Sequence, residues 1–135
     1  MNMKPLFADT SFYVALLNPR DVAHQKARQV SQQSRCPVGL TDFVLLELGN
    51  AFSSAGQRGL FLKLAAHLRS DRNTRIVAAS RELLEQGLDL FANRTDKDWS
   101  LTDCTSFVVM QAEDLLDALT TDRHFEQAGF AALLR

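Results

Sequence analysis

The chain has 135 residues, 46% of them hydrophobic, which is enough apolar material to bury the core of one domain. Its 15 basic and 16 acidic residues nearly cancel, so no overall field draws the protein to nucleic acid or to anionic lipid. Cys36 and Cys104 belong to no C-x-x-C pair, which argues against a disulfide scaffold or a thiolate zinc site and favours a reducing compartment. Too few apolar residues precede Asp9 for a signal peptide, and no apolar run approaches the length of a membrane span. We therefore expect one cytoplasmic domain over residues 1–135, without a membrane partner.

Short apolar runs alternate with helical patterns from one end of the chain to the other. The expected strands cover residues 6–8, 37–41, 75–78, 118–121 and 130–134. The expected helices cover residues 10–17, 22–34, 43–52 with a cap at Thr41 or Asp42, 59–68, the stretch from a Ser80 cap to Phe91, the stretch from a Ser100 or Thr102 cap through Met110, and 123–127. Because parallel neighbours need a crossover that a helix supplies, this alternation predicts an α/β fold with a parallel sheet covered on both faces.

Four acidic residues occupy positions where they can meet. Asp9 and Asp122 follow expected strands, Asp103 lies in the first turn of an apolar helix, and Glu47 lies in a helix that follows a strand. Ligands of parallel sheets bind at the carboxyl ends of strands, so all four can face one edge. Two carboxylates about 4 Å apart repel by roughly 4 kcal/mol at an effective dielectric constant of 20, and a divalent cation would cancel that cost. Oxygen ligands without Cys or His nearby favour Mg²⁺ or Mn²⁺.

Each acid also has a plain structural interpretation. Asp9 and Asp122 can cap the helices that follow them, and the spacing of Ser100 and Asp103 approximates a capping box. Glu47 lies on a polar helix face that solvation alone would explain. If these roles were the whole account, the chain would be an interaction module without catalysis, and carboxylates more than about 10 Å apart would exclude a shared metal site.

Four ordered segments resemble the motifs of the PIN domain, especially of its VapC-type toxin branch. They are Asp9-Thr10-Ser11, Leu45-Leu46-Glu47, the stretch from Trp99 to Cys104, and the stretch from Leu119 to Phe130. The resemblance spans nearly the whole chain, and its two later blocks are the specific ones. It implies a three-layer domain with a central parallel sheet of strand order 3-2-1-4-5 flanked by helices, an acidic site that binds Mg²⁺ or Mn²⁺, and endoribonuclease activity.

The resemblance also implies roles for individual residues and partners for the chain. Asp9 and Asp103 would be the principal metal ligands, Glu47 and Asp122 would complete the catalytic cluster directly or through water, and the hydroxyls of Thr10, Ser11 and Thr102 would support them. Family members are commonly homodimers silenced by an antitoxin encoded beside them. The aromatic and aliphatic residues that we expect to form an antitoxin groove among the early helices are Phe12, Tyr13, Phe52, Leu60 and Phe61.

Several residues close to the acids in the sequence give weaker indications of a function. Arg94, Lys97 and Arg123 are candidates for contacts with the RNA backbone, although no basic run singles them out. Trp99 is expected to pack over the start of the Asp103 helix. His124 could approach a phosphate, although an exposed helical histidine is more often inert, and His124 lacks the paired spacing of a zinc site.

An aspartate-based phosphatase is the alternative enzyme. It would use Asp9 as its nucleophile, but the haloacid-dehalogenase-like pattern needs a second acid two residues later, where this chain has Ser11. A receiver-like phosphoacceptor needs an acid after the third strand, where this chain has Ala78-Ala79-Ser80. Both patterns fit less well than a metal-dependent ribonuclease.

Overall fold

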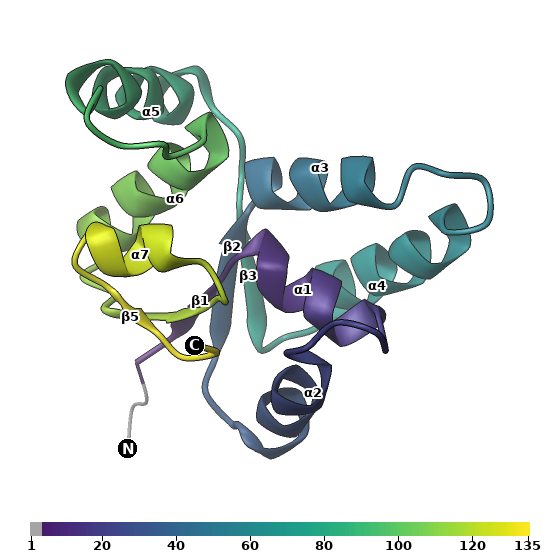
Figure 1. Cartoon of the computed structure of the whole chain (residues 1–135). Coiled ribbons are helices and arrows are strands. Elements are labelled where there is room, and N and C mark those ends of the chain that lie inside the picture. Colours follow the sequence, from purple (N-terminus) through teal and green to yellow (C-terminus); the bar gives the residue numbers. More distant parts are fainter. Residues whose placement is uncertain (1–3) are drawn as a thin grey trace.

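The computed structural model describes residues 4–135, which build one sheet with helices on both sides (Figure 1). Residues 1–3 lie outside the described residues, and they begin the segment that the sequence analysis judged too short for a signal peptide. Five parallel strands are arranged in the order β3-β2-β1-β4-β5, which confirms the order that the resemblance implied. The strands are β1 (Leu6–Ala8), β2 (Val38–Thr41), β3 (Thr74–Val77), β4 (Asp117–Leu119) and β5 (Ala131–Ala132).

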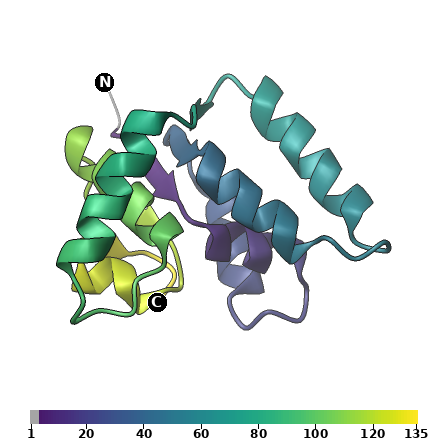
Figure 2. The ribbon, with the colours of Figure 1, turned by 90° about the horizontal axis from the view of Figure 1, so that it is seen from above.

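Seven helices connect and cover the strands within residues 4–135. They are α1 (Thr10–Leu17), α2 (His24–Gln33), α3 (Asp42–Ala51), α4 (Arg58–Ser70), α5 (Arg81–Asn93), α6 (Leu101–Ala112) and α7 (Arg123–Gln127). Seen from above, α1 to α4 lie on one side of the molecule and α5 to α7 on the other (Figure 2). None of the helices in this described part of the chain has the length and apolar character that crossing a bilayer requires.

Side-chain caps fix where several helices begin. The Thr41 hydroxyl accepts the backbone N–H of Val44 at 3.1 Å, so Thr41 rather than Asp42 caps α3. The Ser80 and Ser100 side chains cap α5 and α6 in the same way, as expected. Because α3 starts directly after β2 and α5 starts shortly after β3, the Thr41 and Ser80 caps hold these helix N-termini at the carboxyl edge of the sheet.

Several boundaries differ from the expectation by one or two residues. Helix α2 starts at His24 rather than at residue 22, because the Asp21 side chain accepts the N–H of Ala23 and holds a turn there. Strand β4 ends at Leu119 rather than at residue 121. The last strand spans only Ala131–Ala132 instead of residues 130–134, because its pairing is limited to the short β4.

The core is rich in aromatic side chains. The Phe107 ring lies 4.9 Å from the Phe125 ring and 5.0 Å from the Trp99 ring, both edge-on. Trp99 therefore packs over the start of α6, as predicted, and is only 5% exposed.

The expected antitoxin groove needs a correction. Phe12, Tyr13 and Phe52 are 4%, 2% and 6% exposed, so they belong to the core and offer nothing to a partner. Leu60 is 44% exposed and Phe61 is half-buried, which leaves α4 as the part of that surface that is open.

Helices α5 and α6 approach each other closely at a glycine. A Cβ atom built on Gly87 would lie 2.6 Å from Cγ2 of Thr105, a distance at which the two helices could not keep their present spacing. The absence of a side chain at Gly87 thus sets how near α5 lies to the helix that carries Asp103.

Candidate active site

The four acids of the sequence analysis line one cavity at the carboxyl edge of the sheet, together with Asp21 and Asp98. Asp9 follows β1 directly, Asp122 comes three residues after β4, Glu47 projects from α3 and Asp103 from the first turn of α6. The cavity has a volume of about 390 Å³, and its lining also includes Ser11. Parallel strands bring the residues that follow them to the same edge, which explains why acids far apart in the sequence face one space.

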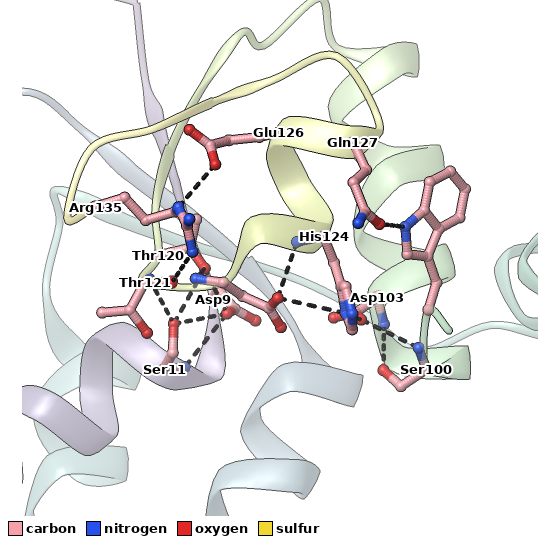
Figure 3. Close-up of polar contacts among 12 residues, drawn as sticks. Asp9, Ser11, Ser100, Asp103, Thr120, Thr121, His124, Glu126, Gln127 and Arg135 are labelled. Carbon is pink, nitrogen blue, oxygen red and sulfur yellow. Dashed lines mark hydrogen bonds and ion pairs between the residues drawn. The ribbon is translucent and has the colours of Figure 1, made fainter. Parts of the chain in front are cut away.

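Asp9 is held by hydroxyl groups. It is 4% exposed, and its Oδ2 accepts hydrogen bonds from the Ser11 hydroxyl at 2.8 Å and the Thr120 hydroxyl at 2.9 Å (Figure 3). The Ser11 oxygen in turn accepts the N–H of Thr121, and the Thr120 oxygen accepts the N–H of Asp122. These bonds tie the end of β1 to the segment after β4 and fix the orientation of the Asp9 carboxylate.

Burial dominates the electrostatics of Asp9. Loss of solvent raises the pKa of Asp9 from its ordinary 3.8 to about 6, although the hydrogen bonds from Ser11 and Thr120 work in the opposite direction. The negative charge of Asp103 raises this pKa further. The ionised carboxylate is therefore held in the folded protein at a cost that a nearby cation would relieve.

Asp103 combines a structural role with a place in the site. Its Oδ2 accepts the N–H of Ser100 at 3.1 Å while the Ser100 hydroxyl accepts the N–H of Asp103 at 3.0 Å, which completes a capping box. The same Oδ2 lies 3.0 Å from Nδ1 of His124. Burial raises the pKa of Asp103, the bonds from His124 and Ser100 lower it, and the charge of Asp122 raises it. Capping and membership of the acidic cluster are thus not alternatives at this residue.

The sequence analysis considered His124 as a phosphate contact or an inert surface residue, but did not place it among the acids. Its side chain is 20% exposed, and Nδ1 lies 3.0 Å from Asp103 Oδ2 and 3.4 Å from Asp122 Oδ1. The interpretation of His124 as a solvent-facing helical histidine is therefore wrong. Asp122 caps α7 by accepting the N–H of His124 at 2.9 Å. The signal that could have indicated the role of His124 is therefore its place two residues after an acid that caps a short helix.

Possible ligand atoms of three residues come together in this cluster. Those of Asp103, Asp122 and His124 all lie within 4.8 Å of one another, close enough for one ion to reach them. Asp9 and Glu47 line the same cavity but are not part of this group of three, and Oε1 of Glu47 accepts the Thr10 hydroxyl at 2.6 Å. The Thr10 hydroxyl thus fixes the Glu47 carboxylate, whereas a carboxylate on a freely solvated helix face would need no such partner.

The structure places the expected supporting hydroxyls as follows. Those of Thr10 and Ser11 bind Glu47 and Asp9. Thr102 is not among the residues that line the cavity, and its carbonyl accepts the Thr105 hydroxyl at 2.7 Å. Within residues 4–135, the second hydroxyl on Asp9 comes instead from Thr120 at the end of β4.

The expected cationic residues lie at two sides of the site. Arg94 binds Asp96 through Nε and Nη2, at 3.0 and 3.1 Å, and its guanidinium carbon lies 4.9 Å from the centre of the Trp99 ring. Lys97 lines the same neighbouring cavity as Arg94. Arg123 is exposed at the first position of α7.

Comparisons with known proteins agree with this arrangement. The sequence matches the PIN domain family over residues 6–131. It is 32% identical over 127 residues to the 23S rRNA-specific endonuclease VapC20 of Mycobacterium tuberculosis, covering 93% of this chain and 95% of that protein. The crystal structure of M. tuberculosis VapC20, described as a sarcin-ricin loop cleaving toxin, has a TM-score of 0.85 at 27% identity and covers 93% of this chain and 96% of its own.

A chain in a toxin-antitoxin complex from Klebsiella pneumoniae has a TM-score of 0.61 at 15% identity, covers 87% of each chain, and so shares the fold. The family match extends over nearly all of the chain, and the sheet order 3-2-1-4-5 carries an acidic cavity at its carboxyl edge. The chain belongs to the PIN domain family.

Proposed function

We propose that this protein is a divalent-metal-dependent endoribonuclease that hydrolyses RNA phosphodiester bonds. The observation that carries the proposal is the gathering of Asp9, Glu47, Asp103 and Asp122 around one cavity, with Asp9 buried and its pKa raised to about 6. Four carboxylates in one space are costly unless a cation balances them. The 32% identity to an endonuclease specific for 23S rRNA supports the same reaction class.

The donor set fits a hard divalent cation. Carboxylate oxygens outnumber the imidazole of His124, no cysteine lines the cavity, and ions such as Mg²⁺ and Mn²⁺ prefer oxygen ligands. Asp9 and Asp103 would hold the ion, with Glu47 and Asp122 completing its ligands directly or through water. A bound ion would supply an activated water and would neutralise charge that develops on the phosphoryl oxygens.

The chain's own polar groups would keep these ligands in place. Ser11 and Thr120 occupy Oδ2 of Asp9, so Oδ1 is the oxygen that we assign to the ion. Thr10 holds Glu47 through its hydroxyl, and His124 holds Asp103 through Nδ1. Such hydrogen bonds orient metal ligands and typically affect metal affinity or activity about 10- to 100-fold when removed.

The geometry favours hydrolysis by water over the phosphatase alternative. A nucleophilic aspartate must present a carboxylate oxygen to the phosphorus, but Oδ2 of Asp9 already accepts two hydroxyls and Oδ1 is the oxygen assigned to the ion. Ser11, which stands where the phosphatase pattern needs an acid, is one of those two donors. An interaction module without catalysis would not need the buried, hydroxyl-fixed carboxylates that this cavity contains.

We also propose 23S rRNA as the substrate and an antitoxin as a partner, because the relative VapC20 bears the first in its name and its structure is described as that of a toxin. The surface that we assign to the antitoxin is an apolar cavity between α3 and α4, lined by Phe43, Leu46 and Phe61, where Leu46 is 63% exposed.

A cytoplasmic location follows from an rRNA substrate. A homodimer, which family resemblance implies, is tested by light scattering of the purified protein.

The proposed activity is tested with purified protein and ribosomes in Mg²⁺, in Mn²⁺ and in EDTA, with cut sites mapped on the rRNA. Wild type should cut 23S rRNA when a divalent ion is present and not in EDTA. The Asp103→Asn variant should not cut, whereas Asp89→Asn, which removes an exposed carboxylate on α5, should cut like wild type. Cleavage in EDTA, or undiminished cleavage by Asp103→Asn, would overturn the proposal.

A further inference from the structure

A second cavity adjoins the acidic one, where the end of α5 meets the start of α6 (Figure 1). Its volume is about 420 Å³, and its lining includes Phe91, Arg94, Lys97 and Trp99. Asp98 lines both cavities, so the two spaces are neighbours. Their chemistry differs, since carboxylates dominate the lining of the first, whereas the second combines aromatic rings and cations with the single carboxylate of Asp98.

The wall of this second cavity is a fixed stack of flat groups. Phe107 in the core meets Trp99 edge-on at 5.0 Å, and the Arg94 guanidinium lies over Trp99 at 4.9 Å. The Trp99 indole donates to Oε1 of Gln127 at 3.0 Å, and Asp96 holds the edge of the guanidinium through two hydrogen bonds. Trp99 and Asp96 thus restrain the plane of the Arg94 guanidinium, and the Arg94 side chain remains 40% exposed.

Two further side chains give the cavity features that match a nucleotide. Phe91 is 48% exposed, an unusual position for a large apolar ring. Lys97 takes part in none of the ion pairs formed within residues 4–135, and the turn that carries it is closed by the bond from its N–H to the Arg94 carbonyl at 3.2 Å. An aromatic face, a guanidinium plane and a lysine are what unpaired RNA bases and their phosphates bind.

We propose that this cavity binds one unpaired nucleotide of the RNA substrate, adjacent to the phosphodiester that lies in the acidic cavity. The base stacks against the Arg94 guanidinium and the Phe91 ring, and Lys97 contacts the phosphate. This inference rests on the proposed ribonuclease function and adds to it a base-binding subsite. It also explains how a chain with a net charge of −1 holds a polyanion next to four carboxylates, since stacking does not depend on the overall field.

Trp99 makes the subsite directly observable, because it is the single tryptophan of the chain. Wild type is titrated in EDTA with a short single-stranded RNA, and Trp99 fluorescence is followed. Stacking on Arg94 should change that fluorescence, and Phe91→Ala should raise the Kd roughly 5- to 100-fold, the usual effect of losing one base–aromatic stack. Phe91→Tyr keeps the ring and should bind within about twofold of wild type.

Leu88→Ala is the matched control, since Leu88 is a 43% exposed apolar residue of the same helix that does not line the cavity. Its Kd should equal that of wild type. Lys97→Ala should lower the slope of log Kd against log salt concentration by about 0.7, the value for one phosphate contact to a single strand. Thermal unfolding of each variant verifies that these surface changes leave the fold intact.

A double-mutant cycle locates the nucleotide. In a set of RNAs, each lacking one base, a single position should weaken binding to wild type and make no difference to Phe91→Ala. Equal Kd values for Phe91→Ala and Leu88→Ala, the absence of any coupled position, or no binding of RNA to wild type would each overturn the subsite. The proposed function is judged separately, by whether wild type cuts RNA with Mg²⁺ or Mn²⁺. Cleavage without Phe91 dependence refutes only the subsite, and Phe91-dependent binding without cleavage refutes only the enzyme.

Discussion

Replacing Asp9 by Asn should stabilise the metal-free protein near neutral pH. The asparagine keeps an oxygen that can accept the Ser11 and Thr120 hydroxyls, and it removes a charge that burial disfavours. The pKa of Asp9 is about 6 in the folded protein and 3.8 ordinarily, and each tenfold change in proton affinity corresponds to about 1.4 kcal/mol. Ionised Asp9 therefore lowers the stability of the folded state by about 3 kcal/mol at pH 7.5.

The sign of the pH dependence follows from the direction of the shift. A carboxyl with a raised pKa favours folding fully below pH 3.8, and this contribution is lost as the pH rises through about 6. The difference in stability between Asp9→Asn and wild type should thus be largest above pH 7 and approach zero near pH 4. For 135 residues, about 3 kcal/mol corresponds to a rise in melting temperature on the order of 10 °C.

The assay is thermal unfolding in EDTA at several pH values between 4 and 8, with wild type, Asp9→Asn and the exposed-site variant Asp89→Asn. Asp89→Asn should follow wild type at every pH. If Asp9→Asn melts several degrees below wild type at pH 7.5, or if its advantage is the same at pH 4.5, the Asp9 carboxylate acts as a helix cap whose charge is well tolerated. The argument for an electrostatically costly site would then fail.

Three further outcomes are expected. Asp103→Asn should lose RNA cleavage without melting at a lower temperature than wild type. Asp103→Ala removes the acceptor for the Ser100 N–H and should lower the free energy of unfolding by about 1 kcal/mol, so equal melting temperatures of the two variants would contradict the capping box. Mg²⁺ at a hundredfold excess over its Kd should stabilise wild type by about 2.7 kcal/mol in calorimetry, and the double variant Asp9→Asn, Asp103→Asn should lose most of this gain; no shift of wild type in tens of millimolar Mg²⁺ would exclude the ion site. Gly87→Ala should lower the free energy of unfolding by about 1–3 kcal/mol in urea, because its Cβ would meet Thr105, and Thr105→Ser should restore much of it; a Gly87→Ala protein more stable than wild type would show that α5 can move away freely.

Local signals predicted the elements well and their ends less well. The Ser80 and Ser100 caps could be predicted because a cap depends on a few neighbouring residues. The extent of the last strand could not, because Ala131 and Ala132 count as strand only through their pairing with Asp117 and Ala118. The length of β5 thus depends on its partner strand β4.

The same distinction holds in the site. The positions of Asp9 and Asp122 after strands already indicated that they could share an edge of the sheet. Thr120 could not be identified as the second hydroxyl on Asp9, because that contact joins residues 111 positions apart and depends on how β4 lies beside β1. The burial of Phe12 and Tyr13 was misjudged for a related reason, because it depends on how α1 packs into the assembled core.

The central place of β1 in the sheet has a consequence for the order in which the protein matures. Phe7 pairs with Gly39 on one side and with Ala118 on the other, so β1 waits for a neighbouring strand that comes much later in the chain. Contacts between distant parts of a chain form slowly, because closing the long loop between them must precede any gain from the pairing. During synthesis, the first half of the sheet can assemble while Asp122 and the Thr120 hydroxyl have yet to be translated. The acidic cavity therefore lacks part of its lining, and Asp9 one of its two hydroxyl donors, until the segment after β4 docks.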